Sequence, residues 1–288
     1  EAQSLFLQGK IKLVVVFPPQ YASTADADVQ LLADATDPNE ATQLTAYATT
    51  IIASAKAEIQ GNLLQPEEKA QLMQVGIMPV THLLYNPTMK GAYNFVPGVM
   101  GLILILICAL MTSVGIVKEK EMGTMEVLLV SPMKPVYIIL AKAIPYLLLS
   151  IVNVATILAL SYFLLKVPIA GSLVLLVAVS ILYALVSLCL GLLISTIADT
   201  QQAAMLISAM VLMLPVILLS GMVFPIENMP DILQWLSNIV PAKWYIIAVK
   251  DVMIKGLSAG AILKEIGILS FMVIFLVILS VKRFKTRL

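Results

Sequence analysis

The sequence predicts a mainly α-helical membrane protein, a transmembrane helix bundle with a small α/β domain before it. Three observations lead to this fold class. Hydrophobic residues make up 60% of the 288 residues and charged residues only 12%, whereas soluble domains are about half apolar and about a quarter charged. The mean hydropathy is +0.98. The apolar residues are also concentrated after residue 94, in runs long enough to cross a bilayer.

Residues 1–94 are mixed in polarity and predict a small α/β domain. A Val-rich run that stops at Pro18 and Pro19 is typical of a buried strand. Asp37 can cap a helix and Pro38 suits a first helical turn, so a helix is expected to begin there. The expected elements are, in chain order, two strands, two helices and a third extended segment: 11–17, 29–33, 37–60, 66–74 and 80–85.

Residues 95–288 contain five apolar runs, each close to the ~20 residues that a helix needs to cross ~30 Å of hydrocarbon. The expected spans are about 95–117, 136–165, 171–194, 203–220 and 262–281. Pro145 and Pro215 fall inside spans, where kinks are expected because proline leaves a backbone carbonyl without its helical partner. Segment 221–255 is too apolar for an ordinary loop. Its prolines divide it into short pieces, with one short helix expected at 230–239.

Basic residues set the expected orientation. Both arginines and two lysines lie in the tail after residue 281, and three lysines flank the connection 118–135. The positive-inside rule places both regions in the cytoplasm. Residues 1–94 are then extracytoplasmic, in a multi-pass protein of the inner (plasma) membrane. A sixth span is therefore expected before Glu1, which would carry residues 1–94 outside; the alternative is a removed signal sequence and a five-span protein.

The sequence has little that could support chemistry on this chain. It contains no G-x-x-x-x-G-K-[ST] loop, so ATP is not expected to be bound and split here. His82 is the one histidine, and Cys108 and Cys189 lie in apolar runs, so neither an enzyme nor a metal site is predicted. The spans are nearly free of charge, which disfavours an ion-coupled carrier. A net charge of +1 gives no reason to expect nucleic acid as a partner.

The connection 118–132 has the pattern of a short helix between two spans. Gly123 permits a sharp turn, Thr124 can cap a helix, and Glu126 would lie in its first turn, where the helix dipole favours an acid. Ser131-Pro132 would end it. Its apolar residues recur at three- and four-residue spacing: Met125, Leu128 and Leu129. Such a helix could lie on the lipid headgroups as a connector or dock into a groove on a cytoplasmic partner.

The same connection resembles a known family. The coupling helix region of permeases of the type-2 family of ATP-binding-cassette (ABC) transporters is similar to the run Glu119-x-Glu121-x-Gly123-Thr124-x-Glu126-x-Leu128-Leu129-x-Ser131-Pro132. The usual lead-in to the family's second span is similar to Tyr85-Asn86-Pro87. The family's outer re-entrant hairpin resembles Ser220-Gly221-x-x-Phe224-Pro225-x-x-x-Met229-Pro230, followed by Pro241, Trp244 and Tyr245. The resemblance extends from the outer domain to the basic tail, with the family's first span missing.

This resemblance implies a bacterial ABC exporter of the multidrug efflux type. Two permease chains, identical or homologous, would form the substrate pathway as a dimer. Two cytoplasmic ABC ATPase subunits would hold ATP and Mg and drive it, and the outer domain could meet a periplasmic adaptor. The residues that the resemblance assigns to ATPase coupling are Glu119, Glu121, Gly123, Thr124, Glu126, Leu128 and Leu129. Those that it assigns to an outer hairpin or gate within 221–255 are Gly221, Phe224, Pro225, Met229, Pro230, Trp244 and Tyr245.

Other interpretations stay open from the residues alone. A membrane scaffold or sensor whose outer domain binds a ligand would need no ATPase. A passive channel would need polar rings along a pore, and the spans offer only scattered Ser, Thr and Asn. The hairpin could be a packed cap with no gating role. The cargo is undecided among an amphiphilic drug, a lipid-linked compound and a peptide.

Overall fold

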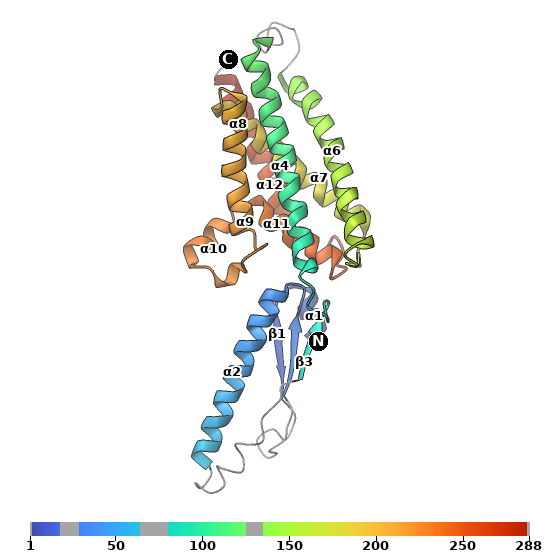
Figure 1. The fold of residues 1–288 in the computed structure, drawn as a ribbon, viewed down its shortest axis with the longest axis vertical. Coiled ribbons are helices and arrows are strands. Elements are labelled where there is room, and N and C mark those ends of the chain that lie inside the picture. The colour runs from blue at the N-terminus through green and yellow to red at the C-terminus, as the bar shows by residue number, and fades with distance from the viewer. Residues whose placement is uncertain (1, 18–28, 64–79, 125–134, 287–288) are drawn as a thin grey trace. The chain divides into compact units, whose positions relative to one another are not determined.

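The computed structural model describes residues 2–17, 29–63, 80–124 and 135–286. The chain divides between Tyr93 and Asn94 into two compact units. The first unit contains a small sheet with helices, and the second is built from long helices (Figure 1). The mainly α fold with a small sheet, predicted from the sequence, is confirmed.

The first unit is a three-stranded sheet with two helices. In chain order the elements are α1 (Ala2–Leu7), β1 (Leu13–Val16), β2 (Gln30–Asp34), α2 (Pro38–Leu63) and β3 (Val80–Leu84). The strand order is β1-β2-β3. Strands β1 and β2 are antiparallel, with Leu13 opposite Ala33, and β3 runs parallel to β2, with Gln30 opposite Val80. The three extended segments and the longer helix are confirmed; α1 was not predicted, and the helix predicted at 66–74 lies outside the described residues.

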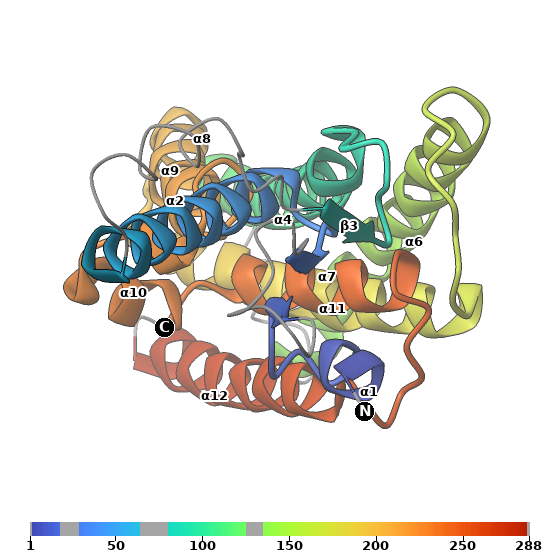
Figure 2. The ribbon, with the colours of Figure 1, turned by 90° about the horizontal axis from the view of Figure 1, so that it is seen from below.

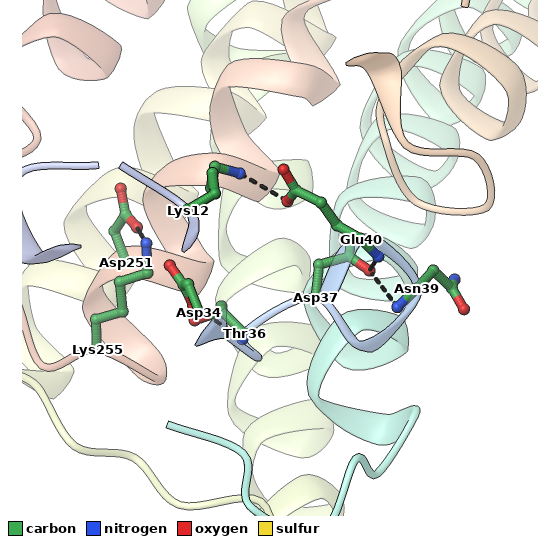
Figure 3. Close-up of polar contacts among 8 residues, drawn as sticks. All are labelled: Lys12, Asp34, Thr36, Asp37, Asn39, Glu40, Asp251 and Lys255. Carbon is green, nitrogen blue, oxygen red and sulfur yellow. Dashed lines mark hydrogen bonds and ion pairs between the residues drawn. The ribbon is translucent and has the colours of Figure 1, made fainter. Parts of the chain in front are cut away.

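Helix α2 is held to the sheet by apolar packing and by its first turn. Ala48 and Ile52 pack with Val29 and Leu31 in a buried cluster. The Oδ1 atom of Asp37 accepts a hydrogen bond from the backbone N–H of Asn39 at 3.1 Å, as expected of an N-cap. Lys12 next to β1 pairs with Glu40 of α2 at 2.7 Å, and the hydroxyl of Thr36 donates to Asp34 (Figure 3).

The second unit consists of helices and short helical segments. They are α4 (Ala92–Glu121), α6 (Pro135–Phe163), α7 (Leu173–Ile197), α8 (Gln201–Ser208), η1 (Ala209–Met213), α9 (Leu214–Leu219), η2 (Ile226–Asn228), α10 (Asp231–Ser237), α11 (Pro241–Met253) and α12 (Leu263–Thr286). Among the described residues, five helical stretches are long and apolar enough to cross a membrane. They are Ala92–Glu121, Ile144–Phe163, Leu173–Ile197, Gln201–Leu219 and Leu263–Ser280. The chain is a multi-pass membrane protein.

Helix α7 lies at the centre of this unit. It packs against α12, α11 and α6, and Figure 2 shows α11 and α12 running beside it. Half of the most apolar stretch of α7 is buried, against 17% in α12. Gly191 permits a close approach to α4, because a Cβ there would overlap the carbonyl oxygen of Ala109. Cys108 and Cys189 are both buried.

The stretch Gln201–Leu219 is not one regular helix. Helix α8 continues into η1, a π-helical turn, and then into α9, which has Pro215 in its first turn. Proline cannot donate the backbone hydrogen bond of a regular helix, and π-turns are one of the ways in which a helix adjusts around such a position. The sequence predicted a kink at Pro215; the structure has this π-turn directly before it.

Candidate functional site

The first candidate region is the end of α4, where the coupling residues were predicted. Gly123 takes a left-handed backbone with φ +69°, which a glycine adopts at little cost and which commonly ends a helix. Its N–H donates to the carbonyl of Lys120 at 3.2 Å. The hydroxyl of Thr124 donates back to the carbonyl of Glu119 at 3.3 Å. The predicted turn at Gly123 is confirmed, and Thr124 helps to satisfy the end of α4.

The remaining predicted coupling residues have different surroundings. Glu119 is half-buried, with its Oε2 atom out of contact with solvent, whereas Glu121 is exposed. Met122 is 64% exposed and lies beside a run of charged residues. The other predicted residues, Glu126, Leu128 and Leu129, lie outside the described residues.

Two neighbouring residues of α4 bind the ends of two other helices, and we call their contacts the polar tie. The Nζ atom of Lys120 donates to the carbonyl of Ser195, in the last turn of α7, at 2.6 Å. The carboxylate of Glu121 accepts from the backbone N–H of Gln201, the first residue of α8, at 3.0 Å. It also accepts from the side-chain amide of Gln201. Lys120 and Ser195 are 75 positions apart in the sequence, and Glu121 and Gln201 are 80 positions apart.

Below the polar tie, α4 and α8 pack directly. Val117, Ala198 and Ala204 form a buried cluster. One turn deeper, the hydroxyls of Ser113 and Ser208 lie 2.9 Å apart and are buried. Either hydroxyl can be the donor between the helices, and the Ser113 hydroxyl also lies within hydrogen-bond distance of the carbonyl of Leu110 in its own helix, at 3.0 Å. The two helices are therefore joined over more than one turn.

The second candidate region is the segment 221–255, and it begins with a turn against α4. Gly221 has φ +80°. The carbonyl of Met222 accepts from the side-chain amide of Asn94 at 3.2 Å, a buried hydrogen bond. The Met222 side chain fills the space beside Gly98, where any Cβ would collide with it. The start of the segment is thus fixed to the first turns of α4.

The first half of this segment is exposed and apolar. Segment η2 begins after Pro225 and α10 begins after Pro230, so each proline marks the start of a short helical piece. The side-chain amide of Gln234 donates to the carbonyl of Met229 at 2.8 Å, which closes the turn between them. Exposed apolar residues gather here: Val223, Phe224, Ile232, Leu233, Trp235, Leu236 and Ile239. We call them the exposed apolar face.

The second half of the segment is helix α11, and its residues are buried. Tyr245 stacks on Tyr183 of α7, with ring centroids 4.3 Å apart and an interplanar angle of 8°. The hydroxyls of Tyr245 and Ser180 are 2.9 Å apart, and the hydroxyl of Tyr183 donates to the carbonyl of Gly101 at 3.1 Å. We call Tyr183 and Tyr245 the tyrosine pair. It joins α11, α7 and α4 in one buried contact.

Trp244 lies next to the tyrosine pair but makes polar contacts. Its indole N–H donates to the carbonyl of Asn238 at 3.0 Å. The Nζ atoms of Lys243 and Lys264 are 5.3 and 5.4 Å from the centre of its ring, within the range of cation–π interactions. Burial lowers the pKa of Lys243, an effect that Glu227 opposes and Lys264 reinforces. A tryptophan with one apolar side and cations nearby is typical of a membrane interface.

The end of α11 is fixed by backbone and charged contacts. The N–H of Ala170 donates to the carbonyl of Met253 at 2.8 Å. Lys255 pairs with Asp251 at 3.3 Å, with both side chains largely buried (Figure 3). Within the described part of the chain, no cluster of three or more His, Cys, Asp or Glu residues could hold a metal ion.

Several residues of these regions were not predicted. Ser195, at the end of α7, and Gln201, at the start of α8, lie in the stretch 195–202, which has no basic residues and was expected to connect two spans. Ser180 and Tyr183 lie inside an apolar span. For Gln201 a signal existed, because Thr200 caps α8 by accepting from the N–H of Ala203, and serine or threonine before an apolar run is a helix start. The tyrosine pair had no such signal, since its residues are 62 positions apart and ordinary in composition.

Comparison with known proteins identifies the family. The family described as ABC-2 family transporter protein matches residues 1–282. The probable multidrug ABC transporter permease YbhS of Escherichia coli (strain K12) is 32% identical over 256 residues, which cover 86% of this chain and 66% of that protein. The corresponding permease YbhR is 33% identical over 253 residues, with the same coverage. ABC transporter G family member 20 of Dictyostelium discoideum is 30% identical over 237 residues, which cover 82% of this chain and 31% of that protein.

The chain spans 66% of the length of the two bacterial relatives. No solved structure matches it. The family match covers both compact units and all five membrane-spanning helices described above. The resemblance first seen in residues 119–132 is thereby confirmed: the chain belongs to the ABC-2 family of transporter permeases.

Proposed function

We propose that the chain is the membrane-spanning subunit of an ATP-driven exporter, and that it is coupled through residues 118–132 to an ATPase on another polypeptide. The observation that supports this most directly is the end of α4. The span ends in a run of charged residues, Gly123 turns the chain sharply, and Met122 is exposed beside the turn. An exposed apolar side chain within a charged rim suits a groove on a partner protein.

The energy source follows from what the spans contain. They have few ionisable residues, so proton or sodium coupling has little to act on. ATP and Mg²⁺ would be bound by the partner ATPase. The positive-inside pattern favours a cytoplasmic position for residues 118–132 and for the tail. Residues 1–93 would then lie outside the inner membrane, where an adaptor could reach them.

The substrate pathway would form between two permease chains. Only 17% of the apolar stretch of α12 and 22% of Gln201–Leu219 are buried within one chain, so both have large faces for lipid or for a second permease. The names of the bacterial relatives describe them as probable multidrug permeases. We infer a similar class of apolar or amphiphilic cargo, moved outward. The segment 221–255 would close the outer end of the pathway.

The test is co-purification of the permease with a co-expressed ATPase in detergent. Wild type is compared with Gly123→Pro, because proline fixes φ near −65° and cannot take the +69° backbone, and with Glu126→Lys. Matched controls are Gly9→Pro, at another left-handed glycine, and Glu227→Lys, in the segment 221–255, which would lie on the other side of the membrane from residues 118–132. We expect both test variants to lose the ATPase or its stimulated hydrolysis, with both controls unaffected.

The alternative outcome favours a different function. If wild type retained no ATPase, or if all four variants behaved as wild type does, the coupling role would be wrong. A membrane scaffold or sensor that uses its outer domain would then be the better interpretation. Thermal unfolding of every variant in detergent shows whether any loss of binding reflects loss of folding.

A further inference from the structure

We propose that Lys120 and Glu121 are positioning residues: they join the coupling region to the connection 195–202 and to helix α8, and they do not contact the ATPase. This role rests on the proposed function, and it names the contacts through which motion at the end of α4 would reach α8. The resemblance placed Glu121 among the residues that meet the partner. In the structure, both carboxylate oxygens of Glu121 instead accept hydrogen bonds from Gln201.

The two charges of the polar tie match the two helix ends that they bind. The C-terminal end of a helix has unpaired carbonyls and a partial negative charge, and the N-terminal end has unpaired N–H groups and a partial positive charge. Lys120 donates to a carbonyl in the last turn of α7. Glu121 accepts from the first N–H of α8. Consecutive residues of opposite sign thus hold consecutive helices by their opposite ends.

The direct packing beneath the tie extends it into the membrane. The hydroxyls of Ser208 and Ser113 of α4 form a hydrogen bond inside a buried region, and the cluster around Val117 and Ala204 lies between them and the tie. Helix α8 therefore has contacts with α4 at its first residue and its last. A displacement of the end of α4 is expected to carry the whole of α8 with it.

The π-turn η1 follows immediately after the last of these contacts. The hydrogen-bond pattern of the helix changes at η1, and Pro215 at the start of α9 lacks a backbone donor. Such sites are where helices bend. Motion of α8 would thus be absorbed at η1. The coupling region would act on the start of the 201–219 span as well as on α4, through a connection that the sequence pattern had not assigned to coupling.

The test uses a charge introduced at position 201 and removed at position 121. Gln201→Glu places two carboxylates together, so the tie should open. Adding Glu121→Gln restores one acid and one amide. The amide oxygen of residue 121 can still accept from the backbone N–H of residue 201, and its NH₂ group can donate to the new carboxylate, so that only the side-chain hydrogen bond is reversed. The matched control is Gln202→Glu, which adds the same charge at the next residue, an exposed one. A hydrogen bond to a charged group commonly contributes a free energy that corresponds to about a tenfold change in an equilibrium constant.

The experiment measures three quantities on the full permease assembled with its ATPase in lipid nanodiscs or detergent. They are retention of the ATPase, ATP hydrolysis that depends on the permease, and the melting temperature of the permease. We expect Gln201→Glu to retain the ATPase but to lose about tenfold in permease-dependent hydrolysis. Gln202→Glu should match wild type. The double variant Glu121→Gln, Gln201→Glu should recover most of the loss, which a general structural defect would not do.

Two results would overturn the inference while leaving the proposed function intact. One is a Gln201→Glu variant with wild-type hydrolysis. The other is loss of ATPase retention in Glu121→Gln that the second change does not restore, because Glu121 would then contact the partner itself. A wild-type permease that retains no ATPase would overturn the proposed function, and this inference with it. Melting of the single and double variants shows in each case whether positions 121 and 201 interact.

Discussion

Two of the contacts that hold helix α7 near α4 differ in kind. In its first half, the tyrosine pair and Ser180 are fully enclosed, and the contact combines ring stacking with hydroxyl hydrogen bonds. In its last turn, the polar tie uses charges that are exposed or half-buried. Buried aromatic packing is strong and insensitive to salt, whereas exposed charged contacts are weak and screened.

This difference indicates which end of the unit can respond to a partner. The end with the tyrosine pair has apolar area and enclosed hydrogen bonds, so large free energies oppose any change there. The end with the polar tie depends on a few contacts of modest free energy, which a docking protein could rearrange. One end is suited to anchor the helices and the other to move them.

Removing one ring of the tyrosine pair should have the largest effect on stability. We expect Tyr245→Ala to lower the free energy of unfolding by about 3–5 kcal/mol, since it leaves a cavity between three helices. Tyr245→Phe keeps the stack and loses only the hydroxyl, so about 1 kcal/mol is expected. Thermal unfolding in detergent measures both. Tyr162→Ala, at an exposed ring, is the control, and an equal loss there would contradict the special role of the pair.

Closing the space between α4 and α7 should have the next largest effect. A side chain at Gly191 would collide with the backbone of Ala109, so Gly191→Val should cost about 1–3 kcal/mol by overpacking. Gly267→Val is the matched control, because Gly267 lies in the α12 span with open space around it. Unfolding curves of the two variants provide the comparison. Similar losses in both would show that helix propensity, and not close approach, governs the result.

Neutralising Lys120 should have a smaller effect that depends on salt. Lys120→Gln removes a charge from the end of α7, an interaction worth about 0.3–1 kcal/mol at low ionic strength. At 1 M salt the screening length is about 3 Å, so the difference from wild type should shrink. Unfolding at low and high salt measures this. A difference that stays constant with salt would mean that the contact acts by packing. The tyrosine pair variants should show no such dependence.

The smallest effect on folding is expected at the exposed apolar face. Trp235 is 68% exposed, so Trp235→Ala should change the free energy of unfolding by about 0.5 kcal/mol or less. If this face closes the outer end of the pathway, the same variant should nevertheless reduce transport. A drug-accumulation assay in cells that express the permease and its ATPase tests the second part. Wild-type transport by this variant would leave the face without a gating role.

Much of the fold could be predicted because bilayers impose simple rules. A membrane span must be long and apolar, so the runs that contain Met100, Tyr183 or Leu269 were recognisable from composition. Gly123 was recognisable because a glycine between a charged run and a helix start suits a left-handed turn. The strands of the first unit were visible as Val-rich or Leu-rich runs.

The rest could not be predicted because it depends on contacts between distant parts of the chain. The prolines of segment 221–255 suggested short pieces, but Pro241 begins a helix of 13 residues that is buried mainly against α7 and α12. The family resemblance assigned Glu121 to the ATPase partner, and no local rule pairs it with Gln201, 80 residues later. The π-turn leaves no trace in composition, since Ala209–Met213 would be ordinary in a regular helix.

That π-turn has a consequence for how the family diversifies. A π-turn closes its hydrogen bonds one residue later than an α-helical turn and so holds one additional residue. Such a turn arises by a single-residue insertion into a regular helix. Relatives that lack the π-turn should align with this chain only through a one-residue deletion within 209–213. Residues before and after the deletion should lie on the same sides of the helix as they do here. Deleting one residue there should therefore restore regular α-helical hydrogen bonding up to Pro215, so that the length of this span would separate permeases with the π-turn from those without it.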